Sequence, residues 1–344
     1  MNKKIYFKNS KWKYMFLYFI LILFGCSPEN EMEPKDGKRI FVPLEIGGIK
    51  RIQTKSLETQ PHIVNRVLLL PFKKIDESIP TNEEDNFNLD QTSLKQVEIK
   101  ESPTFLTMLE LEQGSTYTIF AIGYGNNDYN INDADQDRKF DLSYSVPDIL
   151  QTLYLQSVSA TDVSGFFSAI GISHDNVLEI GKYFKPEGIK TIKVNLTRSV
   201  SGLSLEIRNI PSSVTSITLI AEKLVQSVFL TDLEFLHVVS EIENEALKTF
   251  STQIPDVGSV SFDHYLLPTF SVNRTRFYLD VQSGIFTERF LMKVNDVAGI
   301  SSNNSISFYP NQLVKISGDY SNIDIGFTLD YSINLDDDDW DGIQ

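Results

Sequence analysis

The chain has 344 residues, of which 41% are hydrophobic and 22% are charged, so it can bury a sizeable core and is not a disordered or fibrous protein. Its 46 acidic residues outnumber 31 Lys and Arg, which gives a formal net charge of -15 at pH 7. Such a surface repels phosphate backbones and argues against nucleic acid as a partner. The length predicts about two domains.

The first 25 residues have the pattern of a signal peptide. Five lysines precede the ten-residue apolar run Met15–Phe24, and no acidic residue occurs among them. The run is too short for a spanning helix, which needs about 20 apolar residues. We therefore interpret residues 1–25 as a signal peptide that is removed. The rest of the chain keeps 26 basic and 46 acidic residues.

The end of this run predicts a lipid anchor. Leu23, Phe24 and Gly25 precede Cys26, the single cysteine of the chain, and together they resemble the lipobox of bacterial lipoproteins. Acylation of Cys26 would attach the mature protein to a membrane, because several buried acyl chains make attachment stable. Residues 26–37 are polar, contain two prolines and read as a flexible tether. Their acidic residues resemble the surface-export signal of lipoproteins from the Bacteroides lineage, which implies a surface-exposed lipoprotein of the outer membrane.

The residues after Lys38 are dominated by a period of two, which is typical of β-strands. In the N-terminal half the pattern predicts one half-buried strand followed by two buried ones, at 40–46, 64–72 and 117–124. Two polar stretches, 73–95 and 126–141, read as surface excursions, and Ser145 to Leu150 could open a short helix.

The strand pattern resumes after Gly188. We expect strands at 193–196, 203–207, 214–221, 261–267, 276–281, 289–294, 305–309 and 313–317. Two sets of short strands with few helices predict an all-β protein made of two tandem β-sandwich domains. We place the domains at 38–190 and 191–344, with the boundary between Gly181 and Thr191.

The C-terminal segment has the most regular alternation in the chain. Apolar side chains occupy every odd position, at Ile323, Ile325, Phe327, Leu329, Tyr331, Ile333 and Leu335. A continuous strand of this length would reach roughly 40 Å, two to three times the usual strand length. One interpretation is the last strand of the second sandwich followed by a polar tail. The other is a donor strand that completes the sheet of a neighbouring subunit.

No motif for catalysis or cofactor binding is present. The sequence contains no nucleophile elbow, P-loop or zinc-protease motif, and the four histidines stand far apart. Two alternating acidic strings, at 133–137 and 337–341, only partly match a calcium loop, because neither has the closing glutamate. We therefore expect no enzyme activity, no metal and no cofactor.

Glycan binding is the main alternative function. Without the signal peptide the chain keeps one tryptophan, Trp340, so a stacking platform of tryptophans is not available. Tyrosines could replace it. Dispersed carboxylates of a hydrolase are a third and less favoured possibility.

Four segments resemble the fimbrillin family of type V pili, and in particular its lipoprotein anchor and minor subunits. They are 64–72 (VNRVLLLPF), 114–119 (GSTYTI), 196–211 (LTRSVSGLSLEIRNIP) and 339–342 (DWDG). The resemblance implies transthyretin-like sandwiches, export to the outer membrane as a lipoprotein, and assembly with other fimbrial subunits by strand exchange.

The resemblance also implies a possible maturation step. Stalk subunits of that family are cleaved after an arginine near the first strand, and Arg39 and Arg51 are the candidates here. The favoured interpretation of both is that they are ordinary surface bases flanking a strand. An anchor would keep its first strand and its lipid. We therefore predict a non-enzymatic surface lipoprotein that acts as an anchor or minor subunit of a fimbrial assembly, with nutrient glycan capture as the alternative.

Overall fold

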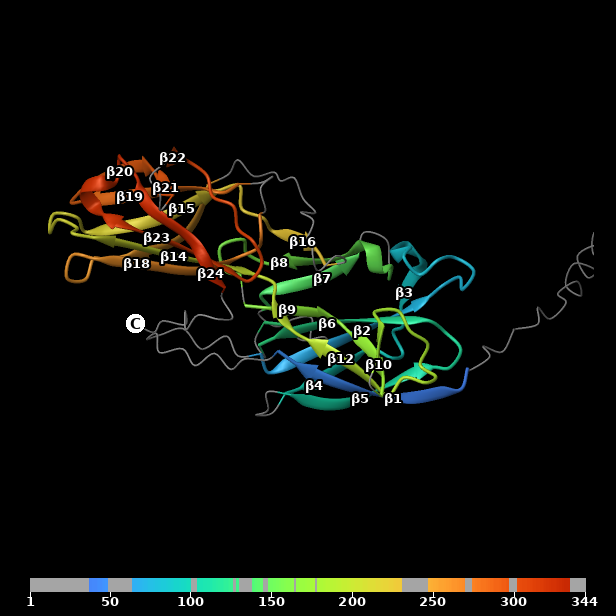
Figure 1. Cartoon of the computed structure of the whole chain (residues 1–344). Coiled ribbons are helices and arrows are strands. Elements are labelled where there is room, and N and C mark those ends of the chain that lie inside the picture. The colour runs from blue at the N-terminus through green and yellow to red at the C-terminus, as the bar shows by residue number, and fades with distance from the viewer. Residues whose placement is uncertain are drawn as a thin grey trace, which may run out of the picture. The chain divides into compact units, whose positions relative to one another are not determined.

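The structure is a computed structural model that describes residues 37–48, 64–99, 104–125, 128–129, 138–144, 148–163, 165–176, 178–230, 247–269, 274–296 and 302–334. Its contacts divide the chain after Arg39, and nearly everything described below belongs to the part from Ile40 onward. The described residues form strands and three short 3-10 helices, with no α-helix among them (Figure 1). No helix in this part is long and apolar enough to cross a membrane. The predicted all-β class is confirmed.

Three sheets make up the N-terminal part of the fold. The first contains, in order across the sheet, β11 (Leu178–Gly181), β10 (Ile172–Asp175), β12 (Thr191–Asn195), β1 (Arg39–Gly47) and β5 (Phe105–Glu112). The second contains β13 (Thr197–Arg198), β9 (Phe167–Ile170), β6 (Tyr117–Tyr124), β2 (Arg66–Lys74) and β3 (Phe87–Leu89), with β4 (Lys95–Glu98) also paired to β2. The third contains β16 (Ser227–Phe229), β8 (Leu153–Ser157) and β7 (Phe140–Tyr144).

The second sheet has a core on each of its faces. Alternate residues of β2 pack in opposite directions, so Val67 and Leu69 join one cluster with β1 and β12. Leu68 and Leu70 join another cluster with β7 and β8. Burial on both faces explains why β2 and β6 are nearly continuous apolar runs in the sequence.

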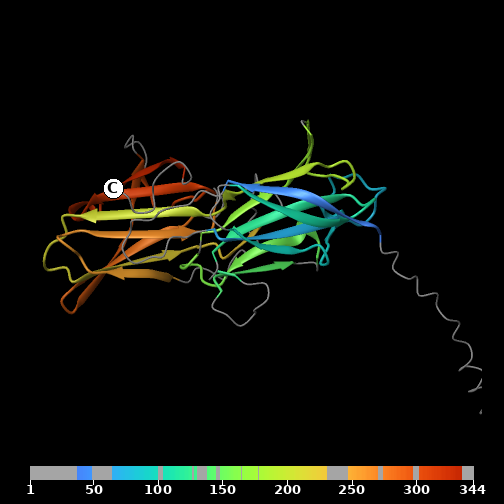
Figure 2. The ribbon, with the colours of Figure 1, turned by 90° about the horizontal axis from the view of Figure 1, so that it is seen from below.

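The C-terminal part is a sandwich of two sheets, visible at the left of Figure 1 and in the turned view of Figure 2. One sheet contains β18 (Val260–Leu266), β14 (Ser201–Arg208), β23 (Gln312–Asp319), β24 (Phe327–Asn334), β21 (Val294–Asp296) and β22 (Ser302–Asn303). The other contains β17 (Lys248–Gln253), β15 (Ser216–Glu222), β19 (Arg276–Ser283) and β20 (Phe286–Leu291). Inward residues such as Leu203, Leu219 and Leu279 are fully buried in one core.

Strand pairing changes along the chain after Arg198. The sequence predicts a C-terminal domain that starts at residue 191. However, β12 pairs in parallel with β1, and β13 pairs with β9, so both strands lie in the N-terminal sheets. β16, which follows β15 in sequence, also pairs with β8 of the third sheet. The chain therefore leaves the N-terminal sheets after β13, beyond residue 190, and one later strand, β16, pairs again with an N-terminal strand.

Several short elements differ from the expected ones. The excursion at 73–95 contains the 3-10 helix η1 (Glu84–Asn86), β3 and the first residue of β4. The expected helix near residue 150 is the single 3-10 turn η2 (Leu150–Thr152), which leads directly into β8. The expected strand at 305–309 forms only one bridge, between Ile306 and Thr275. Ile306 and Phe308 are buried, so the alternation of apolar residues here reflects their packing in the core and not a paired strand.

Candidate assembly surfaces

β1 is an interior strand of its sheet, between β12 and β5. Its residues alternate between a buried row, at Val42, Leu44 and Ile46, and a row that includes Phe41, which is 66% exposed. The parallel register pairs Leu44 with Ile192 and Ile46 with Val194, so the buried row packs beside other core residues. Removal of β1 would leave an apolar groove between β12 and β5 and would expose one face of the core.

The two candidate cleavage residues differ in their relation to β1. Arg39 begins the strand and is half-buried. Cleavage after Arg39 would therefore leave the buried row in place. Arg51 lies outside the described residues, but it follows β1 in sequence, so cleavage there would separate the whole strand from the body. Cleavage after either arginine stays a prediction.

The candidate donor segment begins with a turn and not with a strand. Residues Tyr320–Asn322 form the 3-10 helix η3, and the amides of Ile325 and Gly326 donate to the carbonyl of Asn322 at 2.9 and 2.8 Å. Gly326 has φ +135°, a backbone conformation that residues other than glycine rarely adopt. The continuous strand expected over 323–335 is therefore wrong at its start, and β24 begins at Phe327.

The described part of β24 belongs to the protein's own sheet. It pairs antiparallel with β23 along most of its length and in parallel with β21 over Phe327–Leu329. Phe327 and Leu329 are buried in the core, as is Ile323 before the turn, whereas Ile325 is 69% exposed. Tyr331 and Ile333 lie in β24, but their side chains are outside the described set, and Leu335 lies beyond it. Donation by this segment stays a prediction.

The predicted lipid anchor lies outside the described residues. This applies to Leu23, Phe24, Gly25 and Cys26, and to most of the tether at 26–37. Both acidic strings fall there as well. Among the described residues, no group of three His, Cys, Asp or Glu side chains is placed to hold a metal ion.

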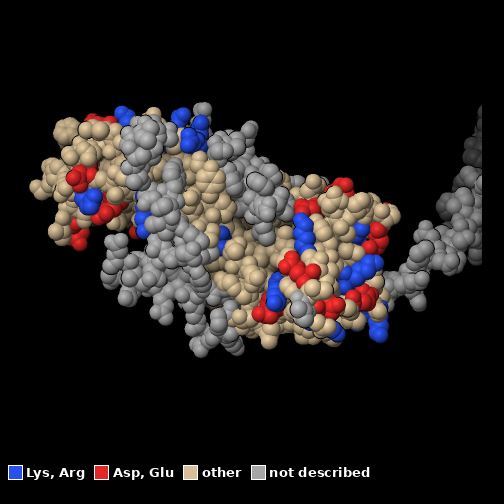
Figure 3. Space-filling model, viewed as in Figure 1, with Lys and Arg blue, Asp and Glu red and all other residues tan. Residues whose placement is uncertain are grey.

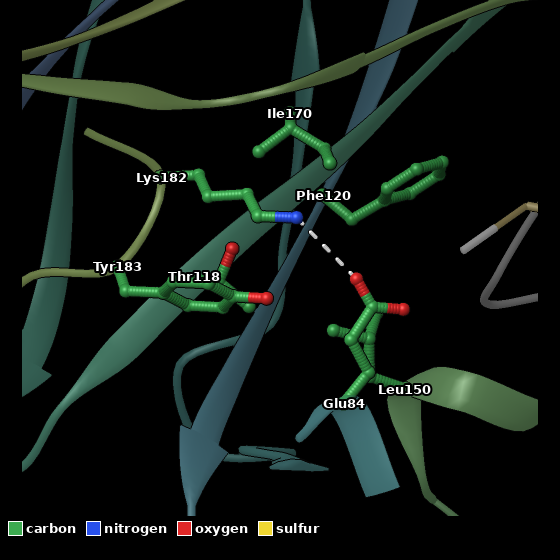
Figure 4. Close-up of a pocket in the computed structure, with 7 residues that line it drawn as sticks. All are labelled: Glu84, Thr118, Phe120, Leu150, Ile170, Lys182 and Tyr183. Atoms are coloured by element: carbon green, nitrogen blue, oxygen red, sulfur yellow. Dashed lines mark hydrogen bonds and ion pairs between the residues drawn. The ribbon is translucent and has the colours of Figure 1, made fainter. Parts of the chain in front are cut away.

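A small hollow opens over β6 and β9, and Figure 4 shows the side chains that line it. Its volume is about 240 Å³, part of which is open to solvent. The Lys182 ammonium lies 3.4 Å from a Glu84 carboxylate oxygen and 5.0 Å from the centre of the Tyr183 ring. Burial alone would lower the pKa of Lys182, but Tyr183 and Glu84 together raise it and keep the amine protonated.

The charged and aromatic side chains of this hollow already have partners within the protein. The Tyr183 ring already stacks on Phe87, with ring centres 5.2 Å apart, and the floor is apolar, from Phe120, Leu150 and Ile170. The hollow therefore closes the surface over the second sheet. Of its two aromatic rings, Phe120 is buried in the floor and Tyr183 is engaged with Phe87. It does not favour the glycan-binding alternative.

Two polar groups, one half-buried and one buried, were not singled out by the sequence. His264 on β18 lies 3.1 Å from the hydroxyl of Ser251 on β17, and burial lowers its pKa to about 4. Arg198 on β13 is 2% exposed and donates to the Tyr265 hydroxyl at 2.5 Å. Its guanidinium lies 4.9 Å from the centre of the Phe167 ring. A lone histidine or arginine in a strand pattern carries no sequence signal for either role.

Comparison with known protein families gives one match. Residues 52–228, a little over half of the chain, match the model of the fimbrillin-A associated anchor proteins Mfa1 and Mfa2. The chain belongs to this family. It is accordingly a structural subunit of fimbriae, of the anchor-associated kind, associated with the cell surface and assembled with other subunits. The predicted fimbrillin resemblance is confirmed, and no curated protein matches the chain.

Solved structures with a similar arrangement include two from Bacteroidetes and one from a Gram-positive bacterium. The fimbrial anchor protein Mfa2 of Porphyromonas gingivalis is 11% identical, with 81% of this chain and 91% of that chain covered and a TM-score of 0.42. A Bacteroides ovatus protein described as an adhesin is 10% identical, with 90% and 98% covered and a TM-score of 0.46. The shaft pilin SpaA of Lactobacillus rhamnosus GG is 8% identical, with 86% and 99% covered and a TM-score of 0.28.

The family match covers the N-terminal sheets apart from β1, and the first strands of the C-terminal sandwich. It begins after β1 and ends within β16. Three of the segments on which the resemblance depended, at 64–72, 114–119 and 196–211, lie inside it. These segments become β2, the start of β6, and the run from β13 through β14.

Proposed function

We propose that this chain is a lipid-anchored subunit at the membrane end of a fimbrium, held in the outer membrane through Cys26 and joined to its neighbours by β-strand exchange. The observation that carries the anchor role is the place of β1. Leu44 and Ile46 are fully buried, and β1 is paired on both sides. A subunit that keeps β1 has no vacant groove there, so it does not need to receive a strand at this site.

The strand that this subunit offers lies at its C-terminus. Among the described residues, β21 pairs with β24 only over Phe327–Leu329, whereas β23 continues along β24 to Asn334. The later half of β24 and residues 335–344 are therefore the part of the segment whose backbone a neighbour could use. We propose that they form the donor, while Phe327 and Leu329 hold the strand in its own core.

Attachment is tested by fractionating cells that produce the wild type or Cys26→Ala. The proposal predicts that the wild type and its fimbriae stay with the outer membrane, and that Cys26→Ala sheds fimbriae into the medium. A Cys26→Ala protein that stays in the membrane with its fimbriae would contradict the lipid anchor.

Strand donation is tested by deleting residues 335–344, which leaves every described residue in place. We expect the shortened protein to fold and to reach the membrane, but no longer to co-purify with fimbriae. Unchanged co-purification would contradict the donor role. Deletion of an equal length from the tether, residues 28–37, serves as the control.

A further inference from the structure

The C-terminal sandwich carries most of its exposed apolar side chains at one end. This end is where β14 finishes at Arg208, and the β17–β18 connection, the β19–β20 hairpin and the η3 turn lie there, at the left of Figure 1. We name it the loop end. The apolar side chains on it are 69–99% exposed. They include the four most exposed large hydrophobic residues described, Val257 (99%), Ile285 (90%), Ile254 (78%) and Phe286 (74%), together with Ile325 (69%).

Strand register places these residues together. Ile217 near the start of β15 pairs with Gln253, so Ile254 follows at the same end. Ser216 pairs with Gln282, which brings the β19–β20 turn with Ile285 beside it. On the facing sheet, Arg208 pairs with Asp319, and the η3 turn with Ile325 follows directly. Five apolar side chains from three connections therefore share one end of the sandwich.

Val257 is apolar and exposed at a position where its backbone conformation is strained. It occupies the tight turn between Asp256 and Ser259, and both Val257 (φ +49°) and Gly258 (φ +79°) have positive φ. Turns of this kind favour Asn, Asp or Gly, and a β-branched residue at positive φ is an outlier. An almost fully exposed valine at such a position gains nothing from the fold, which points to a contact outside it.

The charges at the loop end select among possible partners. Arg208 and Arg289 face Asp319 and Asp280, at 3.9 and 2.6 Å. Other charged side chains described around these loops include Asp256, Glu288, Asp324 and Lys293. The acidic groups are in excess among these four. Figure 3 shows separate acidic and basic spots on a mostly uncharged surface at the left of the view.

We propose that the loop end docks into an apolar hollow lined by Lys or Arg on a neighbouring fimbrial subunit. This inference rests on the proposed function and adds to it a contact that does not involve strand exchange. The excess of carboxylates disfavours an anionic lipid surface, and it also disfavours the same end of a second copy. Apolar tips with an acidic rim match a partner with the opposite arrangement.

The test uses fimbriae collected from cells that lack this subunit, and it measures their affinity for the purified chain. Val257→Asn and Ile285→Asn remove two apolar tips, and Asn suits the positive φ at 257, so the double variant should melt no lower than the wild type. We expect its affinity to fall at least tenfold. Leu178→Asn, at a 72% exposed position on β11, is the matched control and should change affinity less than twofold.

Charge reversal provides a second readout. Glu288→Lys should weaken binding at low salt, whereas Glu179→Lys, at an exposed position on β11 of the N-terminal sheets, should not. Equal affinity of the wild type and the double Asn variant would overturn the inference. Binding to anionic phosphatidylglycerol vesicles that the double variant loses would also overturn it and assign the loop end to lipid. If the wild type neither binds fimbriae nor co-purifies with them, the proposed function itself fails.

Discussion

The guanidinium of Arg198 donates a hydrogen bond of 2.5 Å to the hydroxyl of Tyr265, which joins β13 of the N-terminal sheets to β18 of the C-terminal sandwich. The same guanidinium lies 5.3 Å from the centre of the Tyr265 ring. Val200 lies between β13 and β14 in sequence, and it is fully buried in the cluster that also contains Tyr265. The chain therefore passes between the two sets of sheets through packed structure and not through an exposed linker.

The Arg198–Tyr265 contact predicts a stability loss when its acceptor is removed. Tyr265→Phe keeps the ring but leaves a buried donor without this acceptor, which costs about 1–3 kcal/mol. Urea unfolding should therefore show a lower midpoint. Tyr154→Phe, which removes a half-buried hydroxyl on β8, should change the free energy of unfolding by less than about 0.5 kcal/mol. Equal effects of the two changes would contradict a specific role for the contact.

Gly318 is required by the ring that packs over it. A Cβ at Gly318 would lie 2.2 Å from Cδ1 of Phe327, a distance at which one group must move. Gly318→Ala should destabilise the C-terminal sandwich by about 1–3 kcal/mol, as overpacking of a core does. At Gly47 the added Cβ would meet only the end of the Asn195 side chain, at 3.1 Å, so Gly47→Ala is the milder control. Thermal unfolding measures both, and a Gly318→Ala protein as stable as the wild type would contradict this packing.

His264 predicts a loss of stability in mild acid. Burial lowers its pKa from 6.5 to about 4 in the folded protein, although Asp162 acts in the opposite direction. Above pH 6.5 the histidine is neutral in both states and adds no pH dependence. As the pH falls from 6.5 to 4, the unfolded chain binds a proton that the folded chain does not, so stability falls by up to about 3 kcal/mol.

Replacement of His264 isolates this contribution from the titration of carboxylates. The difference between the wild type and His264→Gln should change with pH between 6.5 and 4 and stay constant above 6.5. Urea unfolding at several pH values measures it. Parallel pH profiles for the two proteins would show that His264 is not the titrating group.

The buried row of β1 predicts that the strand is part of the stable fold. Leu44→Ala removes a fully buried side chain and should cost about 2–5 kcal/mol, whereas Phe41→Ala changes a side chain that is 66% exposed and should cost far less. Chemical denaturation of the two variants provides the comparison. If Leu44→Ala is as stable as Phe41→Ala, β1 does not contribute to the core in the way that the structure indicates.

Alternation in the sequence predicted strands well where one face of a strand is buried. Leu203, Leu205 and Ile207 on β14 alternate with more exposed residues, as expected. The same signal failed at the C-terminus, because Ile323 and Phe327 are both buried although a turn separates them. A period of two cannot distinguish a strand from a turn that returns the next apolar residue to the same core.

Pairing between distant segments had no local signal. The parallel pair of β1 and β12, and the return of β16 to β8, join residues more than 70 positions apart. The assembly surfaces were predictable only in part for the same reason. Cys26 and the C-terminal alternation are local patterns, whereas the loop end depends on which connections between strands the register brings together.

Mass spectrometry of the mature N-terminus, on protein isolated from cells, tests the central claim most directly. The account predicts a chain that begins at an acylated Cys26 and runs without a break through Arg39, β1 and Arg51. A free, unlipidated N-terminus after Arg51 would contradict it, because such a protein would have lost both its membrane anchor and the strand that fills its own sheet.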